Sequence, residues 1–509
     1  MATQNIDRVL AQADDLIVSR MNEDALAGLA VGIVHDGALV YARGFGLADA
    51  KEDTPVTPDT VFRIGSISKT FTAIGLMQLW EQGRFQLDDP VNDCLRAYKL
   101  RHRDAEAPPV TFRHLLTHTA GIGEFRDIFD LARFRTTFAL GAKEDQPVRP
   151  LREYYGGVLA PEVYPGEKWA YANHGFATLG QLVEDISGEP FEDYMATHVF
   201  APLGMFHTDY LLSERVRDRL ARGYQLKKGG LVPVEYLEVV VRAAGSIFSS
   251  VSDMAKYVAA LMNGGRNEQG AVLQPETLSM MMQPHYQADP RLPGMGLAFW
   301  LDSFDGHHVA WHDGGWSGFT SAMYVAPEDR LGVVAFTNTT SLFGGPDPLA
   351  RKLLRALLDV GPGADVPQPG LLETPHLWAE LCGYYGPKPG FMTNVRVWLA
   401  VTGEADVFVK KNRLTMRAIA GPLRKGMTLY RTDPADPLVF QGTFEKMEVP
   451  VVFGRNSTGQ VDRLSVGGVF SYHTLYKRPL LESLRLKINA LIAGLLAAAL
   501  GWCLRRRGH

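Results

Sequence analysis

A serine and a lysine three residues apart open a predicted helix early in the chain. Ser66 and Lys69 belong to the stretch Arg63-Ile-Gly-Ser-Ile-Ser-Lys69, and an apolar-periodic run continues from Thr70 to Gln82. Positions i and i+3 share one helix face, so the hydroxyl and the amine are expected side by side. At a helix N-terminus a lysine can deprotonate such a serine, and the serine's own amide can stabilise a substrate anion. Because Ser-x-x-Lys pairs also occur on ordinary solvated helix faces, the rest of the chain must decide.

The composition excludes several classes of function. A chain of 509 residues predicts two or three domains at about 150 residues each. Its content of 46% hydrophobic and 21% charged residues is typical of a soluble globular protein, and a net charge of −4 argues against a nucleic-acid partner. Cys94, Cys382 and Cys503 are far apart, so we expect neither a disulfide framework nor a cysteine zinc site.

The two ends of the chain bear on location. Met1 to Asp7 lacks the basic start and apolar core of a secretory signal, so we expect a cytoplasmic catalytic part. Ile488 to Leu504 carries no formal charge and lies between Lys487 and the three arginines 505–507. A spanning helix needs roughly 17–25 apolar residues, so this segment is at the short limit. We expect membrane association through 488–504; a helix docked on the body or on a second subunit is the alternative.

Helix and strand signals alternate through the first 360 residues. Residues 5–22 read as an amphipathic helix, and Asp36-Gly37 between two apolar runs predicts a hairpin. The glycine-containing stretch from 44 to 58 is expected to be a loop. Further predicted helices are 111–118, 175–186 with Asn173 as N-cap, 192–202, 254–262 opened by Ser250-x-x-Asp253, and 348–360 with Asp347 as N-cap; further predicted strands are 308–312, 319–326 and 331–337.

Two smaller features have more than one interpretation. His114 and His118 stand four residues apart on a predicted helix, as two zinc ligands would, but the glutamate of a His-Glu-x-x-His site is absent. Structural roles are therefore favoured for both histidines. The small-residue run Ala244 to Ser246 forms either a scaffold turn or the wall of a pocket.

The C-terminal third differs in pattern. Residues 361–370 are a linker by composition, and 376–480 alternate short apolar runs, such as Val395 to Leu399, with glycine, asparagine and aspartate turns. This pattern predicts a small antiparallel β-barrel or sandwich. The expected domains are catalytic (1–360), linker (361–375), accessory β-domain (376–480) and hydrophobic tail helix (481–509).

Two later motifs complete a set with Ser66 and Lys69. These are Tyr171-x-Asn173 and His312-x-Gly314, and in this order the chain resembles the serine β-lactamase and penicillin-binding-protein superfamily, in particular the class C-related branch with its esterases and D-aminopeptidase-like hydrolases. The resemblance covers about residues 20 to 360 and implies an α+β fold, with an antiparallel sheet flanked by helices and an all-helical subdomain. The stretches that carry it are Val61–Lys69, Leu115–Gly121, Pro165–Asn173, Ala243–Ser249 and His312–Phe319.

The resemblance implies a role for each motif residue. Ser66 would be the nucleophile that forms an acyl-enzyme, and Lys69 its base. Tyr171 would be a second proton carrier, which requires nearby positive charge because a phenol titrates near ~10. Asn173 would hold Lys69 or bind a substrate amide. The oxyanion would be bound by the backbone N–H groups of Ser66 and Gly315. Neither a cofactor nor a metal is implied.

Position 312 departs from the pattern. β-Lactamases usually have lysine where this chain has His312, and a neutral histidine is a poor permanent anchor for a carboxylate. His312 could instead hydrogen-bond Tyr171 and assist proton transfer. Glycines at 314 and 315 would let backbone approach the substrate closely.

The sequence therefore favours a cofactor-free serine hydrolase acting on carboxylic esters or on small amides or peptides, D-configured ones included. One alternative is a β-lactamase or D,D-peptidase acting on cell-wall substrates. Another is a membrane-tethered binding protein without turnover. The expected partner is a small ester or peptide, and whether the chain forms a homo-oligomer stays open.

Overall fold

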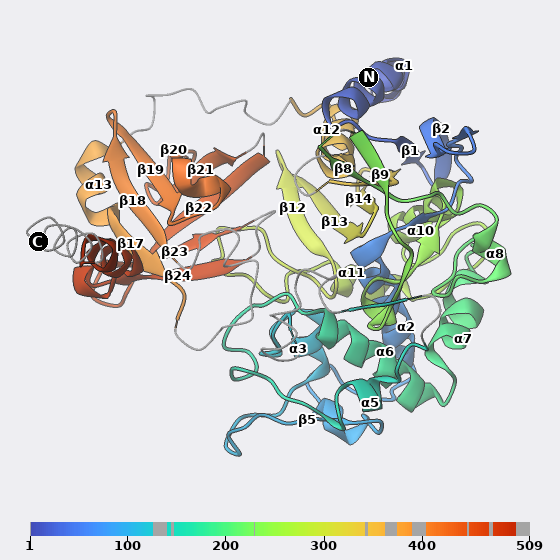
Figure 1. Cartoon of the computed structure of the whole chain (residues 1–509), viewed down its shortest axis with the longest axis horizontal. Helices are drawn as coiled ribbons and strands as arrows, with labels where there is room; N and C mark the ends of the chain where they lie inside the picture. The colour runs from blue at the N-terminus through green and yellow to red at the C-terminus, as the bar shows by residue number, and fades with distance from the viewer. Residues whose placement is uncertain are drawn as a thin grey trace, which may run out of the picture. The chain divides into compact units, whose positions relative to one another are not determined.

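The computed structural model describes residues 2–125, 140–143, 147–228, 230–341, 345–361, 374–388, 404–444, 447–467 and 472–494. Two compact units emerge (Figure 1). The first comprises 1–286 and 293–363, and the second comprises 287–292 and 364–509.

The first unit is built on a seven-stranded antiparallel sheet with the order β12-β13-β14-β15-β1-β2-β3. Strand β1, from near the N-terminus, pairs with β15, so segments about 300 residues apart meet in the middle of the sheet. All seven residues of β15 and seven of the eight in β1 are buried, as expected for central strands covered on both faces. The strands are β1 (Gly28–His35), β2 (Ala38–Asp49), β3 (Thr54–Pro55), β12 (Trp300–Phe304), β13 (His307–Trp316), β14 (Phe319–Ala326) and β15 (Leu331–Thr337).

The predicted hairpin is confirmed, but the loop after it is not. Asp36 and Gly37 both have positive φ, as a two-residue turn between antiparallel strands requires. Strand β2 then continues to Asp49, so the expected loop over 44–58 is wrong in its first part. Gly44 lies within this strand. It must be a glycine there, because a Cβ would lie 2.1 Å from the Val56 carbonyl oxygen. Close backbone approach, rather than a turn, explains this glycine.

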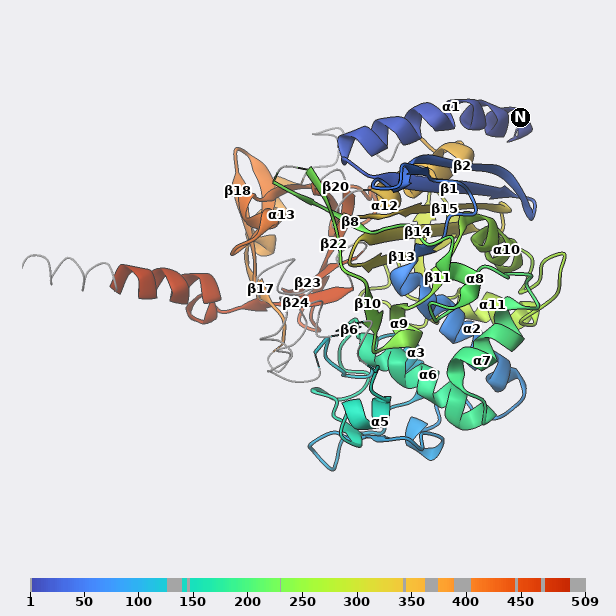
Figure 2. The ribbon, with the colours of Figure 1, turned by 45° about the vertical axis from the view of Figure 1, so that its right-hand side comes forward.

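Helices cover both faces of the sheet (Figure 2). Helix α12 (Pro346–Leu357) packs on β14 and β15 with α1 (Ala2–Glu23) beside it, and α10 (Val251–Met262) packs on the opposite face. Helix α12 begins earlier than predicted, with Gly345 as its N-cap. Asp347 is therefore not a cap; it lies in the first turn and accepts a hydrogen bond from the Tyr324 hydroxyl at 2.7 Å.

Helix α2 (Ser68–Glu81) is buried over most of its circumference and lies in a mainly helical region. The expected all-helical subdomain is wrong in one respect, because this region also contains the short strand pairs β5 (Lys99–Leu100) with β7 (Val158–Leu159) and β6 (Gly141–Lys143) with β10 (Leu237–Val239). Ser66 lies just before α2 on a short 3₁₀ turn, Gly65–Ile67. A helix apolar on nearly every side is typical of the middle of a large core. Helices α6 (Asn173–Ser187), α7 (Phe191–Met195) and α9 (Arg242–Gly245) pack against α2, and α3 (Phe112–Leu116) packs against α6. The same unit also contains α5 (Leu151–Tyr154), α8 (Glu214–Arg217) and α11 (Pro275–Met281).

Two predicted caps turn out differently. Ala172 is the N-cap of α6, so Asn173 is the first helical residue and its side chain is not used as a cap. Ser250 does cap α10, accepting from the Asp253 N–H at 3.2 Å. The Asp253 carboxylate, however, accepts from Thr208 Oγ1 at 2.9 Å and thereby joins α10 to a distant loop.

The second unit contains a closed eight-stranded barrel, preceded by helix α13 (Pro375–Leu381). Strand β17 pairs with β24 and closes the ring, so the barrel alternative of the sequence analysis is the observed one. Apolar side chains such as Val407, Phe440 and Phe453 fill the interior. The predicted run 395–399 lies outside the described residues. The strands are β17 (Gly383–Gly386), β18 (Ala405–Lys410), β19 (Arg413–Ala418), β20 (Met427–Arg431), β21 (Val439–Phe444), β22 (Met447–Arg455), β23 (Val461–Val466) and β24 (His473–Arg478).

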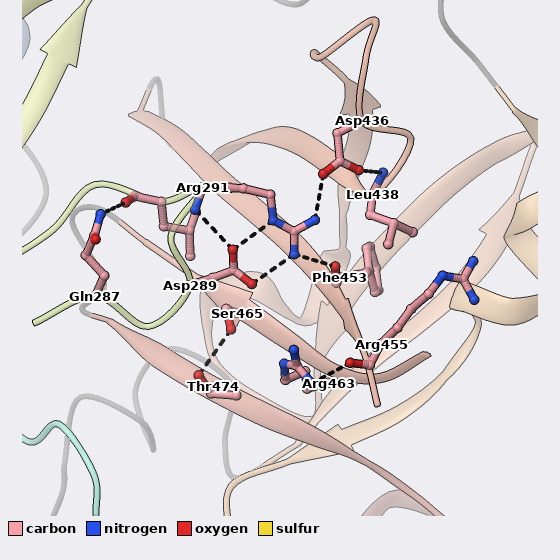
Figure 3. Close-up of polar contacts among 11 residues, drawn as sticks. Gln287, Asp289, Arg291, Asp436, Leu438, Phe453, Arg455, Arg463, Ser465 and Thr474 are labelled. Carbon is pink, nitrogen blue, oxygen red and sulfur yellow. Dashed lines mark hydrogen bonds and ion pairs between the residues drawn. The ribbon is translucent and has the colours of Figure 1, made fainter. Parts of the chain in front are cut away.

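A short segment between the two parts of the first unit, residues 287–292, belongs to the barrel unit (Figure 3). Arg291 binds the Asp289 carboxylate with two nitrogens, at 2.8 and 2.9 Å. Its remaining contacts go to Asp436 Oδ2 at 2.8 Å and to the Phe453 carbonyl oxygen at 2.9 Å. The bidentate pair lies within the segment and orients Arg291, whose contacts with Asp436 and Phe453 fix the segment on the barrel.

A helix over residues 484–494 leaves the barrel after β24. Glu404, fully buried, accepts from the N–H groups of Leu484 at 2.7 Å and Arg485 at 3.1 Å, so a carboxylate fixes the helix N-terminus. Leu491 and Ile492, farther along, are 65% and 49% exposed. None of the helices in the described parts of the chain combines the length and apolar character needed to cross a membrane. Residues 495–509 of the predicted tail lie outside those parts.

Candidate active site

Three helical elements converge on the amine of Lys69. Its Nζ lies 3.0 Å from Ser66 Oγ, 2.8 Å from Asn173 Oδ1 and 2.7 Å from the Ala244 carbonyl oxygen. Lys69 is fully buried, whereas Ser66 keeps part of its surface accessible. The predicted side-by-side placement of hydroxyl and amine is therefore observed, and the run 244–246 supplies a wall of the site.

The partners of Lys69 suit a base. Asn173 Oδ1 and the Ala244 carbonyl can only accept hydrogen bonds. A neutral amine has two N–H groups and one lone pair. If both N–H groups are donated to these acceptors, the lone pair is left for the Ser66 hydroxyl. The rings of Tyr171 and Phe176, with centroids 4.7 and 5.7 Å from Nζ, favour the ammonium that forms once the proton arrives.

Tyr171 contacts the same oxygen from another side. Its hydroxyl donates to Ser66 Oγ at 2.7 Å, and the residue is only 2% exposed. Tyr171 belongs to the extended segment before α6, which brings it next to Asn173 by sequence and next to Ser66 by folding. A base, Lys69, and a hydroxyl donor, Tyr171, thus meet on a single serine side chain.

His118 and Trp300, which the motif analysis did not include in the site, hold the Tyr171 ring. The His118 ring centroid is 4.4 Å from that of Tyr171, and its Nδ1 accepts from the Ala172 N–H at 3.2 Å. His118 has φ of 57°, a left-handed conformation that is uncommon outside glycine. The Trp300 ring stacks on Tyr171 at 6.2 Å and 14°. His114 instead closes a capping box with Thr111, a structural role.

The glycines lie where two backbone segments touch. A Cβ on Gly65, whose φ is 51°, would lie 2.6 Å from the Gly315 nitrogen, so the proposed oxyanion donors are held close together. A Cβ on Gly314 would lie 2.0 Å from the Ile64 carbonyl oxygen. Gly314 is therefore required by packing of the protein itself. A Cβ on Gly315 meets nothing within 4 Å, which leaves space beside that residue.

His312 is fully buried in β13, and its tautomer can be deduced. Its Nδ1 lies 2.6 Å from the Asp313 carbonyl oxygen, which can only accept, so Nδ1 carries a proton. In the neutral ring, Nε2 is then an acceptor. Trp300 lies near both rings, with its centroid 5.7 Å from that of His312.

The roles of Ala244 and Trp300 had no specific signal in the sequence, for two different reasons. Ala244 acts through its carbonyl, which leaves no side-chain signal, and Trp300 lies on β12, a strand that was not predicted. Within the described residues, no group of three histidine, cysteine, aspartate or glutamate side chains is placed to hold a metal ion.

Comparisons with known proteins identify the family of the chain. A family model described as Beta-lactamase matches residues 13–357. The human "Serine beta-lactamase-like protein LACTB, mitochondrial" is 26% identical over 398 residues, covering 63% of this chain and 73% of that protein. "Unguisins hydrolase ungD'" from Aspergillus campestris is 29% identical over 356 residues, covering 66% of this chain and 63% of that protein.

A solved structure extends the likeness beyond the residues that the family model matches. The octameric penicillin-binding protein homologue from Pyrococcus abyssi has a TM-score of 0.61 and 26% identity, covering 92% of this chain and 99% of that chain. The family model alone spans more than half of the sequence. The chain therefore belongs to the Beta-lactamase family, a family of serine hydrolases.

Proposed function

We propose that this protein is a hydrolase that forms an acyl-enzyme on Ser66 and acts on carboxylic esters or on small amides or peptides, D-configured ones included. The observation that carries the proposal is the pair of contacts on Ser66 Oγ, from Lys69 Nζ at 3.0 Å and from the Tyr171 hydroxyl at 2.7 Å. A purely binding site has no need for a base and a second proton carrier on one hydroxyl. In this proposal residues 1–360 form the catalytic domain and 376–480 an accessory domain.

Acylation uses each of these groups once. Ser66 Oγ attacks the substrate carbonyl carbon while Lys69 takes the hydroxyl proton. The negative charge that develops on the carbonyl oxygen is bound by the N–H groups of Ser66 and Gly315. The bond to the leaving group then breaks, and Tyr171 gives that group a proton, which Lys69 restores. Water repeats the attack on the acyl-enzyme and releases the acid.

Asn173 and His312 affect which substrates the site binds. Because Asn173 Oδ1 faces Lys69, its amide NH₂ is left to donate to a substrate carbonyl. The Tyr171 hydroxyl donates its one proton to Ser66 Oγ, so Nε2 of a neutral His312 ring could assist proton transfer only after that hydrogen bond breaks. His312 offers no permanent positive charge, which favours substrates without an anchoring carboxylate. The hydrolase name of the Aspergillus relative agrees with turnover.

A parallel assay tests the proposal. Wild type and Ser66→Ala are treated with a fluorophosphonate probe and supplied with p-nitrophenyl butyrate, a D-alanine amide and nitrocefin. We expect labelling and ester or amide turnover that disappear in Ser66→Ala, with little turnover of nitrocefin. Rapid nitrocefin hydrolysis without esterase activity would support a β-lactamase instead. If wild type is neither labelled nor active, the alternative of a binding protein without turnover is favoured.

We also propose that the tail associates with a membrane. Glu404 accepts a hydrogen bond at the N-terminus of the helix 484–494, and Leu491 and Ile492 farther along are exposed. The sequence after this helix has no charged residue until the three arginines 505–507. Apolar residues followed by basic ones suit an anionic lipid surface.

Deletion from residue 484 is expected to move the protein from the pellet to the supernatant when it is sedimented with phosphatidylcholine–phosphatidylglycerol vesicles. Leu491→Ser with Ile492→Ser should weaken the same binding, whereas Val409→Ser, at a residue 46% exposed on the barrel, should not. Wild type that stays in the supernatant overturns the proposal. An oligomer that dissociates on deletion would instead place the helix on a second copy.

A further inference from the structure

Arg63 is a buried cation beside the site that the reaction above does not use. It ends strand β4 (Phe62–Arg63) and is 2% exposed. One terminal nitrogen donates to the Leu237 carbonyl oxygen at 2.6 Å. Its Nε and other terminal nitrogen have no hydrogen-bond partner among the described residues.

Three aromatic rings enclose the guanidinium. The rings of Tyr236, Phe248 and Trp316 have their centroids 5.1 Å from Arg63 Cζ, within the range of cation–π attraction. Burial lowers the pKa of Arg63 to about 10, with Tyr236 and Glu238 acting in the opposite direction. Cation–π contacts, one hydrogen bond and the attraction of the Glu238 carboxylate offset only part of the desolvation of this buried charge, because the net effect on its pKa is still a lowering. The fold alone therefore does not explain why this residue is charged.

The position of Arg63 suggests a reason. Arg63 lies three positions before Ser66, the first proposed oxyanion donor. Its guanidinium also contacts Trp316, which directly follows Gly315, the second donor. The enclosed cation therefore touches the chain segments of both donors. These segments are also pressed together, because a Cβ on Gly65 would lie 2.6 Å from the Gly315 nitrogen. A shift of the indole would move the end of β13 and its amide.

We propose that Arg63 is a positioning residue for the oxyanion hole. Held by Leu237, its guanidinium packs against the Trp316 indole and keeps the Gly315 N–H directed at the same point as the Ser66 N–H. The inference rests on the proposed function, because it needs an oxyanion to be bound. Displacing an oxyanion donor affects the transition state more than the bound substrate.

The test compares three variants. Arg63→Met keeps the length and bulk of the side chain without its charge, and Arg63→Lys keeps the charge. The control, Arg113→Met, removes an arginine that pairs with Asp88 elsewhere in the same unit. For p-nitrophenyl butyrate we expect Arg63→Met to lower kcat about a hundredfold with little change in KM. Arg63→Lys should lie in between, and Arg113→Met should keep wild-type kcat. The Ki of phenylboronic acid, whose serine adduct is tetrahedral and anionic, should rise in parallel with the loss of kcat/KM.

Thermal unfolding and active-site titration separate this role from a structural one. Arg63→Met removes a buried, incompletely paired charge but also leaves the Leu237 carbonyl without its donor, so its melting temperature should stay within a few degrees of that of wild type. If active-site titration shows that the lower kcat of Arg63→Met comes only from a smaller fraction of active protein, the role proposed for Arg63 is wrong. An unchanged kcat would also overturn that role. Neither result would affect the proposed function. Wild type that neither turns over nor labels overturns the proposed function and this inference with it.

Discussion

Replacing Lys69 by methionine is expected to lower kcat/KM for p-nitrophenyl butyrate about a thousandfold or more, because it removes the base that contacts the nucleophile. Lys69→Arg should be as inactive. Arginine keeps a positive charge and hydrogen-bond donors for Asn173 and Ala244, but it cannot lose a proton in a protein. The pair of variants therefore separates a base from a fixed cation.

Kinetics and circular dichroism melting check this expectation together. Lys69→Met leaves the Asn173 and Ala244 oxygens without their donor, which costs about 1–3 kcal/mol per unsatisfied group, so some loss of stability is expected. Lys256→Met, at a half-exposed lysine on α10, is the control and should retain activity. An active Lys69→Arg variant would show that the amine acts only through its charge.

Tyr171→Phe is expected to affect amides far more than activated esters. A p-nitrophenolate leaves without a proton, whereas an amine has to be protonated as its bond breaks. If Tyr171 gives that proton, the variant should lose about 10²- to 10³-fold in kcat on a D-alanine p-nitroanilide or amide, and much less on p-nitrophenyl butyrate. The ring contacts with His118 and Trp300 are retained in phenylalanine, so the melting temperature should change little.

The leaving-group dependence is the decisive readout. Equal losses on ester and amide would mean that Tyr171 acts before the leaving group departs, as a donor to Ser66 Oγ or as its base. An unchanged rate on both substrates would remove Tyr171 from the mechanism. His118→Phe, which keeps a ring but removes the acceptor for the Ala172 N–H, should give a weaker version of the same selective loss.

Side-chain identity and local patterns were enough to predict much of this molecule. The Asp36-Gly37 turn, helix α2 and strands β13 to β15 follow from local propensity, and Ser66, Lys69 and Asn173 meet where their motifs implied. The turn, the helix and the strands could be predicted because each depends on residues near one another in sequence. The motif residues could be predicted because their side chains carry the chemistry that the motifs imply.

Other features depend on tertiary contacts that no local pattern reports. Gly44 reads as a loop residue until Val56 is placed against it, and the carbonyl of Ala244 is indistinguishable from any other before folding. The segment 287–292 joins the barrel because Asp436 lies opposite Arg291, 145 positions later in the chain. Arg63 likewise gains its significance only when three distant rings enclose it.

The central claim, an acyl-enzyme on Ser66, can be measured directly. Trypsin releases the peptide Ile64–Lys69 by cutting after Arg63 and Lys69, and fragmentation distinguishes Ser66 from Ser68 within it. After an acid quench during turnover of p-nitrophenyl butyrate, we expect the mass of one butyryl group on Ser66, absent from Ser66→Ala. Turnover with the butyryl group on another residue, or turnover that persists in Ser66→Ala, would contradict the claim.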